Sequence, residues 1–521
     1  MQKILSTALA VISMASRQKQ ITYERDGIPM KYVLGIDVGT TGTKTILFSE
    51  KGERIAHAYR SYPLSNPTIG ASEQNADDWW HAVCETVREV VSDKDIADDV
   101  VAISLSTQGG TVVLTDGEGI PLRPAIVWND SRFEAEREKY LRELGDEKSL
   151  YLKTGWKLGK GRPLLAVRYI RDNDPELFGK IRRVLTVPSY ISLKMTGRAA
   201  TDFSNAGIDE FCDISNRKYD EELIKFAGIK KEYLAEFVPS GEVIGNLTAQ
   251  AANELGLSEK TVLVSGAHDQ YAVSLGAGAT NPGDVIIGSG TCWVVTALGK
   301  EFDFDSGFAQ SVSAVDGIFG TLRSLSTGGV CLEWLRNNIA RRSDTDAPID
   351  YKALDLLTAD LRACEDGLFF FPFRGIYGGK DGFTKAAFVG MDLSHNRYHL
   401  ARAVMEGVVF QILWMMEDFK TKPSKEGIKL TGGASRSPVW CKFLADVSGV
   451  PVIIPDVADL GCVGAAILAG VGVGIYSSAT DGHALFSVDE RVLLPDFSMT
   501  EIYRPIFEKY KNTARALGAS Y

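Results

Sequence analysis

Apolar residues along the chain alternate between short strand-like runs and longer stretches with helical spacing. Runs at 33–36, 43–48 and 100–105 lie beside clusters of glycine, serine and threonine, which is typical of buried strands. Apolar side chains at helical spacing predict a helix over 76–91, between the second and third of these strands. Strands that alternate with helices indicate an α/β fold.

A strand, a glycine-rich turn and a second strand follow one another at two places in the chain. The first segment, residues 32–48, reads YVLGIDVGTTGTKTILF, and the second, residues 283–300, reads GDVIIGSGTCWVVTALGK. This repetition, about 250 residues apart, predicts a duplicated fold whose two halves face a shared cleft. We therefore divide the chain into an N-terminal domain at 30–278 and a C-terminal domain at 279–521.

The C-terminal half predicts three helices of different character. Residues 401–416 are strongly apolar, and residues 461–470 are mostly small, which predicts close packing against a neighbour. A further helix begins at Ser437 and Pro438, because serine is a favoured N-cap and proline a favoured first residue. It is expected to end at Gly449.

Length, composition and charge narrow the classes of function. A chain of 521 residues is too long for a single core, and 45% hydrophobic with 24% charged residues is ordinary for a globular protein. The net charge of −10, without a long basic run, argues against a nucleic-acid partner. Seven scattered cysteines without close pairs favour a reducing cytoplasm over a disulfide framework.

The N-terminal residues 1–29 need a separate interpretation. One lysine and an apolar stretch that ends in small residues resemble a short signal peptide, and the stretch is too short to span a bilayer. Met30 lies just before the first predicted strand. We expect a dispensable leader or an over-long start, no membrane partner and a cytoplasmic protein, with export as the alternative.

The first glycine turn carries one carboxylate, Asp37, among small hydroxyl residues. Glycines let a backbone approach a ligand closely, and their N–H groups can point at phosphate oxygens. Asp37 would repel bare phosphate, so it fits only with a cation between them, and Mg²⁺ prefers such a carboxylate. The turn therefore predicts a site for Mg²⁺-nucleotide phosphates, with a plain glycine-rich hairpin as the alternative. The predicted phosphate contacts are Gly39, Thr40, Thr41, Thr43 and Lys44.

Asp269 stands in the sequence GAHDQ, after a predicted buried strand at 261–264. A carboxylate there faces the cleft at the carboxyl edge of an α/β sheet, where it can accept the proton of a substrate hydroxyl during phosphoryl transfer. The N-cap of a helix from Tyr271 onward is an equally good local explanation. The segment 431–435, TGGAS, suits a flat ring system that lies on glycines, or a tight strand-to-helix turn.

Six stretches of the chain occur together in an order that is typical of one family. They are DVGTTGTK (37–44), IVWNDSR (126–132), PSY…MTG…TDFSNA (188–206), GAHDQ (266–270), GM…HL…AVMEG (390–407) and TGGASRSPVW (431–440). In this order they resemble the FGGY carbohydrate kinases of the actin, hexokinase and heat-shock ATPase superfamily, from about residue 32 to about residue 510. The resemblance implies two ribonuclease H-like, actin-like ATPase domains that face a nucleotide cleft, with ATP and Mg²⁺ bound between them.

The resemblance also implies roles for individual residues. Asp269 becomes the general base for the acceptor hydroxyl, and Asp37 becomes the partner of Mg²⁺. The second glycine turn supplies further phosphate contacts, although its sequence GSGT differs from the family's more usual GTSG or GTG. The nucleotide-binding residues implied beyond the first turn are Ser289, Gly290, Thr291, Gly432, Gly433 and Ser437.

The wall of the acceptor site is where the chain departs from well-known members of the family. Glycerol kinases carry an Arg-Glu pair after the glutamine and D-xylulose kinases a Met-His pair, where this chain has two glycines. We expect the glycines to enlarge the pocket, or to offer a backbone N–H in place of a side chain. Trp128 ends a predicted strand over 125–128. The implied acceptor contacts are Gln108, Gly109, Gly110, Trp128, Asp269 and Gln270.

These observations predict an enzyme, a carbohydrate kinase that uses ATP and Mg²⁺ to phosphorylate a hydroxyl of a small sugar, polyol or sugar acid. Glycerol is disfavoured as the acceptor, D-xylulose is less favoured, and a linear autoinducer sugar is an alternative. A non-catalytic, actin-like nucleotide switch is the alternative from a different class. The expected partners are a small sugar and ATP, and a homodimer stays open.

Overall fold

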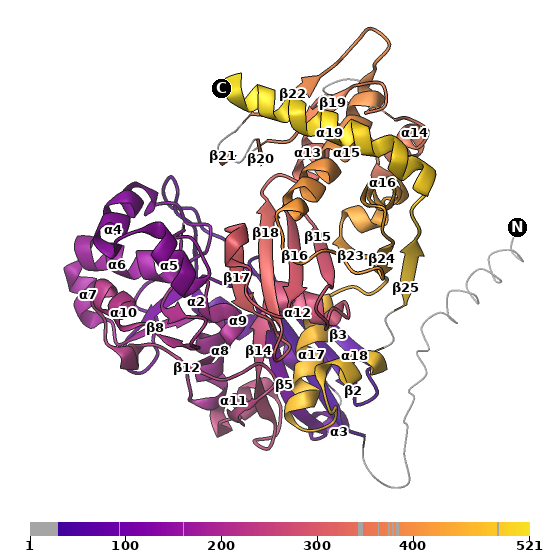
Figure 1. The fold of residues 1–521 in the computed structure, drawn as a ribbon. Helices are drawn as coiled ribbons and strands as arrows, with labels where there is room; N and C mark the ends of the chain where they lie inside the picture. The colour runs from indigo at the N-terminus through magenta and orange to yellow at the C-terminus, as the bar shows by residue number, and fades with distance from the viewer. Residues whose placement is uncertain are drawn as a thin grey trace, which may run out of the picture.

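The computed structural model describes residues 30–520, apart from 93, 160, 342–346, 363, 374–375, 378–379, 382–384 and 487–488. The predicted leader at 1–29 therefore lies outside the described residues. Figure 1 shows two central sheets, one from each half of the chain, with helices packed around them. This arrangement confirms the prediction of a two-domain α/β fold.

The N-terminal half builds a six-stranded sheet around the first glycine hairpin. Its strands, in sheet order, are β13 (Val243–Asn246), β14 (Val262–His268), β5 (Val100–Thr107), β1 (Tyr32–Val38), β2 (Gly42–Ser49) and β3 (Arg54–Ser61). β1 runs antiparallel to β2 and parallel to β5, and β5 runs parallel to β14. The carboxyl ends of β1, β5 and β14 therefore lie side by side at one edge of the sheet.

The C-terminal half repeats this arrangement in a seven-stranded sheet. Its strands, in sheet order, are β17 (Ala309–Val312), β18 (Phe319–Leu325), β16 (Trp293–Gly299), β15 (Val285–Ser289), β23 (Ile428–Gly432), β24 (Val452–Pro455) and β25 (Glu490–Leu493). β15 runs antiparallel to β16 and parallel to β23, as β1 does to β2 and β5. The predicted repetition of the glycine hairpin is thus confirmed in the pairing of the strands.

A smaller four-stranded sheet belongs to a lobe of the N-terminal half, drawn in purple and magenta in Figure 1. Its strands are β4 (Glu73–Gln74), β7 (Ala125–Ile126), β6 (Val112–Thr115) and β8 (Arg183–Thr186). The predicted strand over 125–128 is wrong in its last two residues. β7 ends at Ile126 because a turn follows, in which the N–H of Asp130 donates to the carbonyl of Val127 at 2.9 Å.

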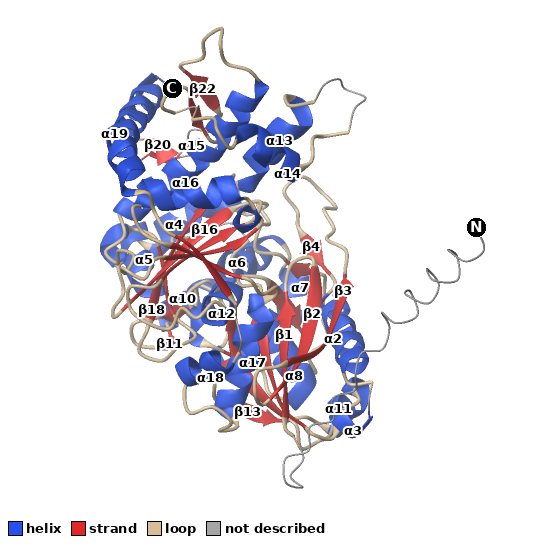
Figure 2. Ribbon diagram, turned by 90° about the vertical axis from the view of Figure 1, so that its right-hand side faces the viewer, coloured by secondary structure: helices blue, strands red, loops and turns tan. Residues whose placement is uncertain are grey.

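Helices cover the sheets, and several of their ends were visible in the sequence (Figure 2). The predicted helix over 76–91 is observed as α2 (Ala76–Val90), which packs against β2 and β3. The apolar helix at 401–416 is α15 (Arg397–Glu417). Ser437 caps α16 (Pro438–Ser448) by accepting from the N–H of Trp440, and Gly449 ends this helix at φ 70°. Among the described residues, no helix is long and apolar enough to cross a membrane.

The remaining helices of eight or more residues, and the shorter ones that the site uses, have the following bounds. In the N-terminal half they are α4 (Arg137–Leu144), α5 (Glu147–Thr154), α6 (Pro163–Asn173), α8 (Val187–Thr196), α9 (Phe203–Ala206), α10 (Glu221–Ala227), α11 (Ala249–Leu255) and α12 (Asp269–Gly276). In the C-terminal half they are α13 (Gly329–Asn338), α14 (Tyr351–Thr358), α17 (Leu460–Gly472), α18 (Ala479–Leu485) and α19 (Phe497–Ser520).

The small-residue helix α17 belongs to the C-terminal half of the sequence but packs on the N-terminal sheet. Figures 1 and 2 both show it beside strands of that sheet, and its neighbours are β1, β5 and α12. A Cβ atom at Gly464 would lie 2.0 Å from the carbonyl oxygen of Ala272, and one at Gly35 would lie 1.9 Å from that of Cys462. Only glycine allows such close approach, so the prediction of close packing is confirmed.

Candidate active site

The first glycine hairpin places Asp37 near the carboxyl end of β1. The turn closes through a bond from the N–H of Gly39 to the carbonyl of Gly42 at 3.1 Å, and the Ser106 hydroxyl on β5 donates to Oδ1 of Asp37 at 2.7 Å. Burial raises the pKa of the Asp37 carboxyl to about 6, and the negative charge of Asp269 contributes to the rise. The predicted metal partner and the predicted base therefore lie close enough to interact.

The N-terminus of α17 lies against the same hairpin. A Cβ atom at Gly461 would stand 3.3 Å from the carboxyl carbon of Asp37. Nζ of Lys44 forms an ion pair with Oδ1 of Asp459, the residue before the helix, at 2.9 Å. A helix N-terminus carries partial positive charge, so it suits the neighbourhood of nucleotide phosphates. The sequence pattern did not single out Asp459 or the start of this helix.

The three threonines of the first turn face different surroundings. The Thr40 hydroxyl donates to Oε1 of Gln108 at 3.1 Å, so this residue links the phosphate turn to the predicted acceptor wall. Thr41 is exposed. Thr43 is fully buried, and its hydroxyl lies 3.5 Å from that of Tyr62. Thr43 thus supports the turn from behind, whereas Thr41 lies on its surface.

The second glycine turn joins the predicted adenine loop. The Ser289 hydroxyl is buried, donates to the carbonyl of Thr431 and accepts from the N–H of Ala434 at 3.1 Å. Gly432 has φ 88°, and a Cβ atom there would meet the backbone of Ser289 at 2.8 Å. The two predicted nucleotide-binding segments are therefore packed directly against each other, and glycine is required at their contact.

The other residues of these two segments differ in exposure. Gly290 and Thr291 are exposed at the tip of the second turn. The N–H of Gly433 donates to the carbonyl of Ser289 at 2.8 Å. The Ser437 hydroxyl donates to Asp355 on α14 at 2.8 Å in addition to its role as N-cap. Ser437 therefore fixes the start of α16 below the loop.

Asp269 is the first residue of α12, immediately after β14. The N-cap position belongs to His268, and no side chain caps this helix, so the alternative interpretation of Asp269 as an N-cap is wrong. Oδ1 of Asp269 accepts from Nε2 of Gln270 at 3.1 Å and lies 3.2 Å from Nε2 of His268. The carboxyl group is about one-third exposed. The Asp269 carboxylate is therefore held in position and is still accessible to a ligand.

Gln108 forms hydrogen bonds through both ends of its amide and so connects the segments of the predicted acceptor wall. Oε1 accepts from the hydroxyls of Thr40 and Thr111 at 3.1 and 3.2 Å, and Nε2 donates to Oε1 of Gln74 at 3.2 Å. Gln108 is only 2% exposed. Trp128 is 43% exposed, and its indole N–H donates to the Thr40 hydroxyl at 3.1 Å. Gln108 is thus buried scaffold, whereas Trp128 presents a surface.

Gly109 and Gly110 do not enlarge the site, so this expectation is wrong. Both are buried. A Cβ atom at Gly109 would stand 2.6 Å from Cδ2 of His268, and one at Gly110, where φ is 72°, would stand 2.9 Å from Nη1 of Arg162. The space that the two missing side chains would occupy is taken by an imidazole and a guanidinium from distant segments. These two groups replace the side chains at the wall.

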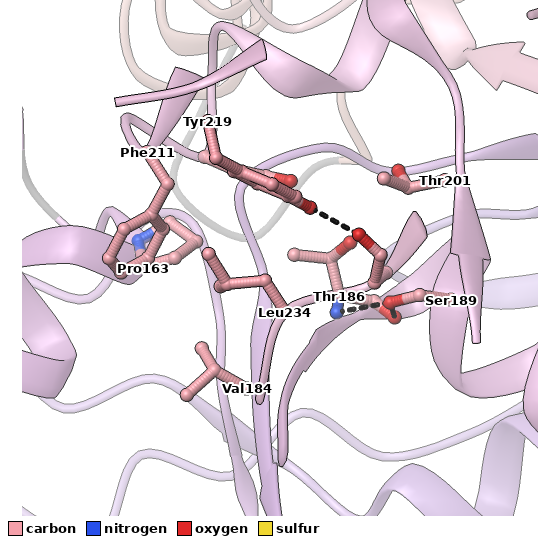
Figure 3. A pocket seen from close by; sticks show the side chains of 10 residues that line it. Pro163, Val184, Thr186, Ser189, Thr201, Phe211, Tyr219 and Leu234 are labelled. Atoms are coloured by element: carbon pink, nitrogen blue, oxygen red, sulfur yellow. Dashed lines mark hydrogen bonds between the residues drawn. The ribbon is translucent and has the colours of Figure 1, made fainter. Parts of the chain in front are cut away.

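A small cavity lies behind the wall, between α6, α8 and β9 (Ala200–Thr201). Figure 3 shows Pro163, Phe211 and Leu234 on its apolar side, and the Tyr219 hydroxyl donates to the carbonyl of Ala235 at 2.7 Å. Asp209 also lines it, and Oδ1 of Asp209 has no hydrogen-bond partner among the described residues. A buried polar atom beside such a space is commonly satisfied by water, so this cavity belongs to the scaffold.

Comparison with known proteins settles the family. Residues 32–276 match the model of the N-terminal domain of the FGGY family of carbohydrate kinases, and residues 284–473 match that of the C-terminal domain. The chain belongs to the FGGY family of carbohydrate kinases. It is therefore an enzyme, and the alternative of a non-catalytic nucleotide switch is wrong.

Relatives of this carbohydrate kinase match it over nearly the whole length. The gluconokinase of Bacillus subtilis (strain 168) is 28% identical over 86% of this chain and 88% of its own. The xylulose kinase of the same organism is 29% identical over 93% and 96%. The crystal structure of xylulose kinase from Rhodospirillum rubrum covers 94% of this chain and 99% of that one, with 29% identity and a TM-score of 0.86.

Three residues that the sequence analysis did not single out contact the predicted acceptor wall. They are Gln74, Arg162 and His268. His268 stands next to Asp269 in the GAHDQ stretch, so its place beside the predicted base could have been inferred from the sequence. Gln74 and Arg162 stand in segments without a recognised motif, and only the folded chain brings them to the wall.

Proposed function

We propose that this kinase transfers the γ-phosphoryl group of ATP to a hydroxyl of a small open-chain sugar, polyol or sugar acid. The observation that carries the proposal is the pair of carboxylates at one sheet edge. Asp37 lies near the carboxyl end of β1 and Asp269 follows that of β14, the two strands that flank β5. Ligands of open α/β sheets bind at this edge.

Asp269 is assigned the role of general base. Its Oδ1 contacts Gln270 and His268, which hold the carboxyl group in place. We assign Oδ2 to the proton of the acceptor hydroxyl, because removing that proton makes the oxygen a better nucleophile toward phosphorus. As the first residue of α12, the carboxylate is also stabilised by the positive end of the helix dipole.

Asp37 is assigned to Mg²⁺. Mg²⁺ is commonly held by one or two carboxylates together with substrate phosphates and water. The site fits this pattern, because Asp37 stands beside the phosphate turn and the described residues form no cluster of three or more His, Cys, Asp and Glu groups that would make a protein-only metal cage. When bound, Mg²⁺ would neutralise charge on the phosphates. Ser106 fixes the orientation of the carboxylate through the bond to Oδ1.

The class of acceptor follows from the relatives and from the wall. Relatives carry the names gluconokinase, xylulose kinase and L-xylulose/3-keto-L-gulonate kinase, which are enzymes for open-chain acids or ketoses. The exposed ring of Trp128 provides a surface on which such a chain can lie, and the buried Gln108 supports it through Thr40. Glycerol remains disfavoured, since the Arg-Glu pair of glycerol kinases is absent at Gly109 and Gly110.

An ADP-release assay over a panel of acceptors tests the proposal. The panel contains pentuloses, tetritols, hexonates and the linear autoinducer sugar, with glycerol as the disfavoured control. We expect ADP release that depends on one class of acceptor and on Mg²⁺, and that stops when Mg²⁺ is chelated. ADP release that no acceptor accelerates would overturn the proposal.

A further inference from the structure

Arg162 is a partly buried cation at the predicted acceptor wall that the proposed mechanism does not use. Its side chain is 16% exposed, and the guanidinium lies over the Trp156 ring, 4.6 Å from the ring centroid. Nη1 stands where a side chain at Gly110 would begin. Stacking on an aromatic face fixes the plane of the guanidinium and leaves its N–H edge available.

The guanidinium lacks a close anion within the protein. Its ion partner is Glu210, with Nε 4.0 Å from Oε1, beyond hydrogen-bond range. In the part of the chain that the structure describes, the buried Nε of Arg162 has no hydrogen-bond partner. A buried arginine is normally paired, because an unpaired buried charge is costly. Among the described residues, Nε of Arg162 therefore lacks a close anion or hydrogen-bond acceptor, which a bound ligand could provide.

Glu210 is itself poorly suited to neutralise Arg162. It is completely buried, has φ 61°, and accepts from the N–H of Gly159 through Oε1 at 3.1 Å. Burial raises the pKa of Glu210 to about 8, and burial also raises the pKa of Asp209 well above its usual range. Burial therefore disfavours the charged form of both carboxyls, and it also lowers the pKa of Arg162 itself.

The position of Arg162 relates it to the acceptor rather than to the nucleotide. Its neighbour Gly161 lies against Trp128, with a Cβ position 2.5 Å from the Trp128 carbonyl oxygen. The Ile208 side chain lies within 3.3 Å of the Cβ positions of both Gly109 and Gly110, and so between the His268 and Arg162 contacts. The wall thus runs from Asp269 through His268 to Arg162, with the proposed base at one end and the cation at the other.

We propose that Arg162 binds a carboxylate of the acceptor, so that the preferred acceptor is an open-chain sugar acid rather than a neutral polyol or ketose. This inference rests on the proposed function. A guanidinium matches a carboxylate through two parallel N–H···O bonds, which a neutral hydroxyl cannot reproduce. The acid group at Arg162 then sets which hydroxyl of the chain reaches Asp269.

Matched pairs of acceptors test this inference. Aldonates of four to six carbons, such as D-gluconate, are compared with the alditols of the same length, such as D-glucitol, and with D-xylulose, as kcat/KM. We expect the wild-type enzyme to prefer an aldonate over its alditol by about 100-fold or more, the size typical when a site's polar groups would otherwise stay unpaired. Arg162→Gln should remove most of this preference, and Arg162→Lys should keep an intermediate part of it.

Two control variants separate recognition from structure. Arg171→Gln changes an exposed arginine on α6, the helix that begins directly after Arg162, and should keep the wild-type preference. Glu210→Gln should also keep the preference if Arg162 serves the acceptor. If Glu210→Gln instead abolishes the preference as Arg162→Gln does, Arg162 serves only to pair with Glu210, and the inference is overturned. Thermal unfolding of each variant shows whether it is folded.

The wild-type data alone also separate this inference from the proposed function. Phosphorylation of an alditol or of D-xylulose, with no aldonate used better than its alditol, would overturn the role of Arg162 and leave the kinase assignment standing. Absence of acceptor-dependent ADP release over the whole panel would instead overturn the proposed function. An aldonate preference that survives in a folded Arg162→Gln variant would contradict the inference directly.

Discussion

At the first glycine hairpin the candidate groups come from a few consecutive residues, whereas at the predicted acceptor wall they come from segments far apart in the chain. The first hairpin forms its turn through its own backbone, between Gly39 and Gly42. The wall instead brings His268 and Arg162 into the space above Gly109 and Gly110. The first turn is therefore defined by local sequence, whereas the predicted acceptor wall depends on tertiary packing, as does the second turn, where Ser289 bonds to Thr431 and Ala434.

This difference explains how such a kinase could change acceptor without changing its nucleotide turns. Loss of side chains at Gly109 and Gly110 is compensated by an imidazole and a guanidinium from elsewhere. The two glycines alone would suggest an enlarged pocket, but His268 and Arg162 fill the space beside them.

The largest effect is expected from Asp269→Asn. The amide has nearly the same shape but cannot take up the acceptor proton, so kcat should fall by at least about 100-fold while the fold is kept. Steady-state kinetics together with thermal unfolding and nucleotide binding would check this. Near-normal turnover in a folded variant would show that another group is the base.

Asp37→Asn should remove activity but stabilise the fold in the absence of Mg²⁺. Burial raises the pKa of Asp37 from 3.8 to about 6, so the charged form is disfavoured in the folded state, and stability is lost as pH rises from about 4 to about 6. Removing that charge should recover up to roughly 3 kcal/mol at pH 7. Urea unfolding at pH 7 with chelator measures the gain.

Asp459, which forms an ion pair, is the control for the stability measurement on Asp37. Asp459 pairs with Lys44 at 2.9 Å, so Asp459→Asn should give no stabilisation and a small loss. If Asp37→Asn is no more stable than wild type under these conditions, burial does not raise the pKa of the Asp37 carboxyl in the folded protein.

Replacing the two wall glycines tests whether the space above them is filled. Gly109→Met combined with Gly110→His should not create a preference for D-xylulose, because the new side chains would collide with His268 and Arg162 and the left-handed backbone at Gly110 would be strained. We expect kcat/KM to fall by about tenfold or more on every acceptor. Gly117→Ala, at a position with no atom within 4 Å of the added Cβ, should have little effect.

A selective gain on D-xylulose in the same double variant would contradict this account. It would mean that the two glycines leave usable room and that His268 and Arg162 move aside at little cost. The ratio of kcat/KM on D-xylulose to kcat/KM on an aldonate would then report on the space at the wall, whereas the overall activity would not.

The smallest effect is expected from raising the pH, which changes the charge of Glu210 beside Arg162. The pKa of Glu210 is raised to about 8 by burial, with Arg162 and Arg137 lowering it and Asp209 raising it. Above pH 8 the carboxylate forms and competes for Arg162, so KM for an aldonate should rise several-fold by pH 9 while KM for the alditol changes less. Glu210→Gln should remove the difference.

The sequence predicts those structural features that are decided by a few adjacent residues better than those that depend on contacts between distant segments. Both hairpins, the Ser437 cap and the helix end at Gly449 were predicted, because turns and caps are decided by a few adjacent residues. The strand through Trp128 was predicted too long, since an apolar run does not show where a turn begins. The small-residue helix α17 was predicted to pack closely, but periodicity does not reveal that its partner is the other half of the chain.

The candidate site divides in the same way. Asp37 and Asp269 were predicted from motifs at strand ends, and the charge of Asp269 contributes, after burial, to the raised pKa of Asp37. Arg162 could not be found, because its segment has no recognised motif and its significance lies in which groups surround it. The predicted domain division at residue 278 stays a prediction, since α17 crosses it to pack on the N-terminal sheet.

A crystal structure of the enzyme with a non-hydrolysable ATP analogue, Mg²⁺ and the best aldonate tests the central claim most directly. We predict that the carboxylate of the aldonate lies about 2.7–3.1 Å from the guanidinium nitrogens of Arg162, and that one hydroxyl lies within hydrogen-bond distance of Asp269, facing the γ-phosphate. An aldonate whose carboxylate points to solvent, with Arg162 moved onto Glu210, would contradict the account of the acceptor wall.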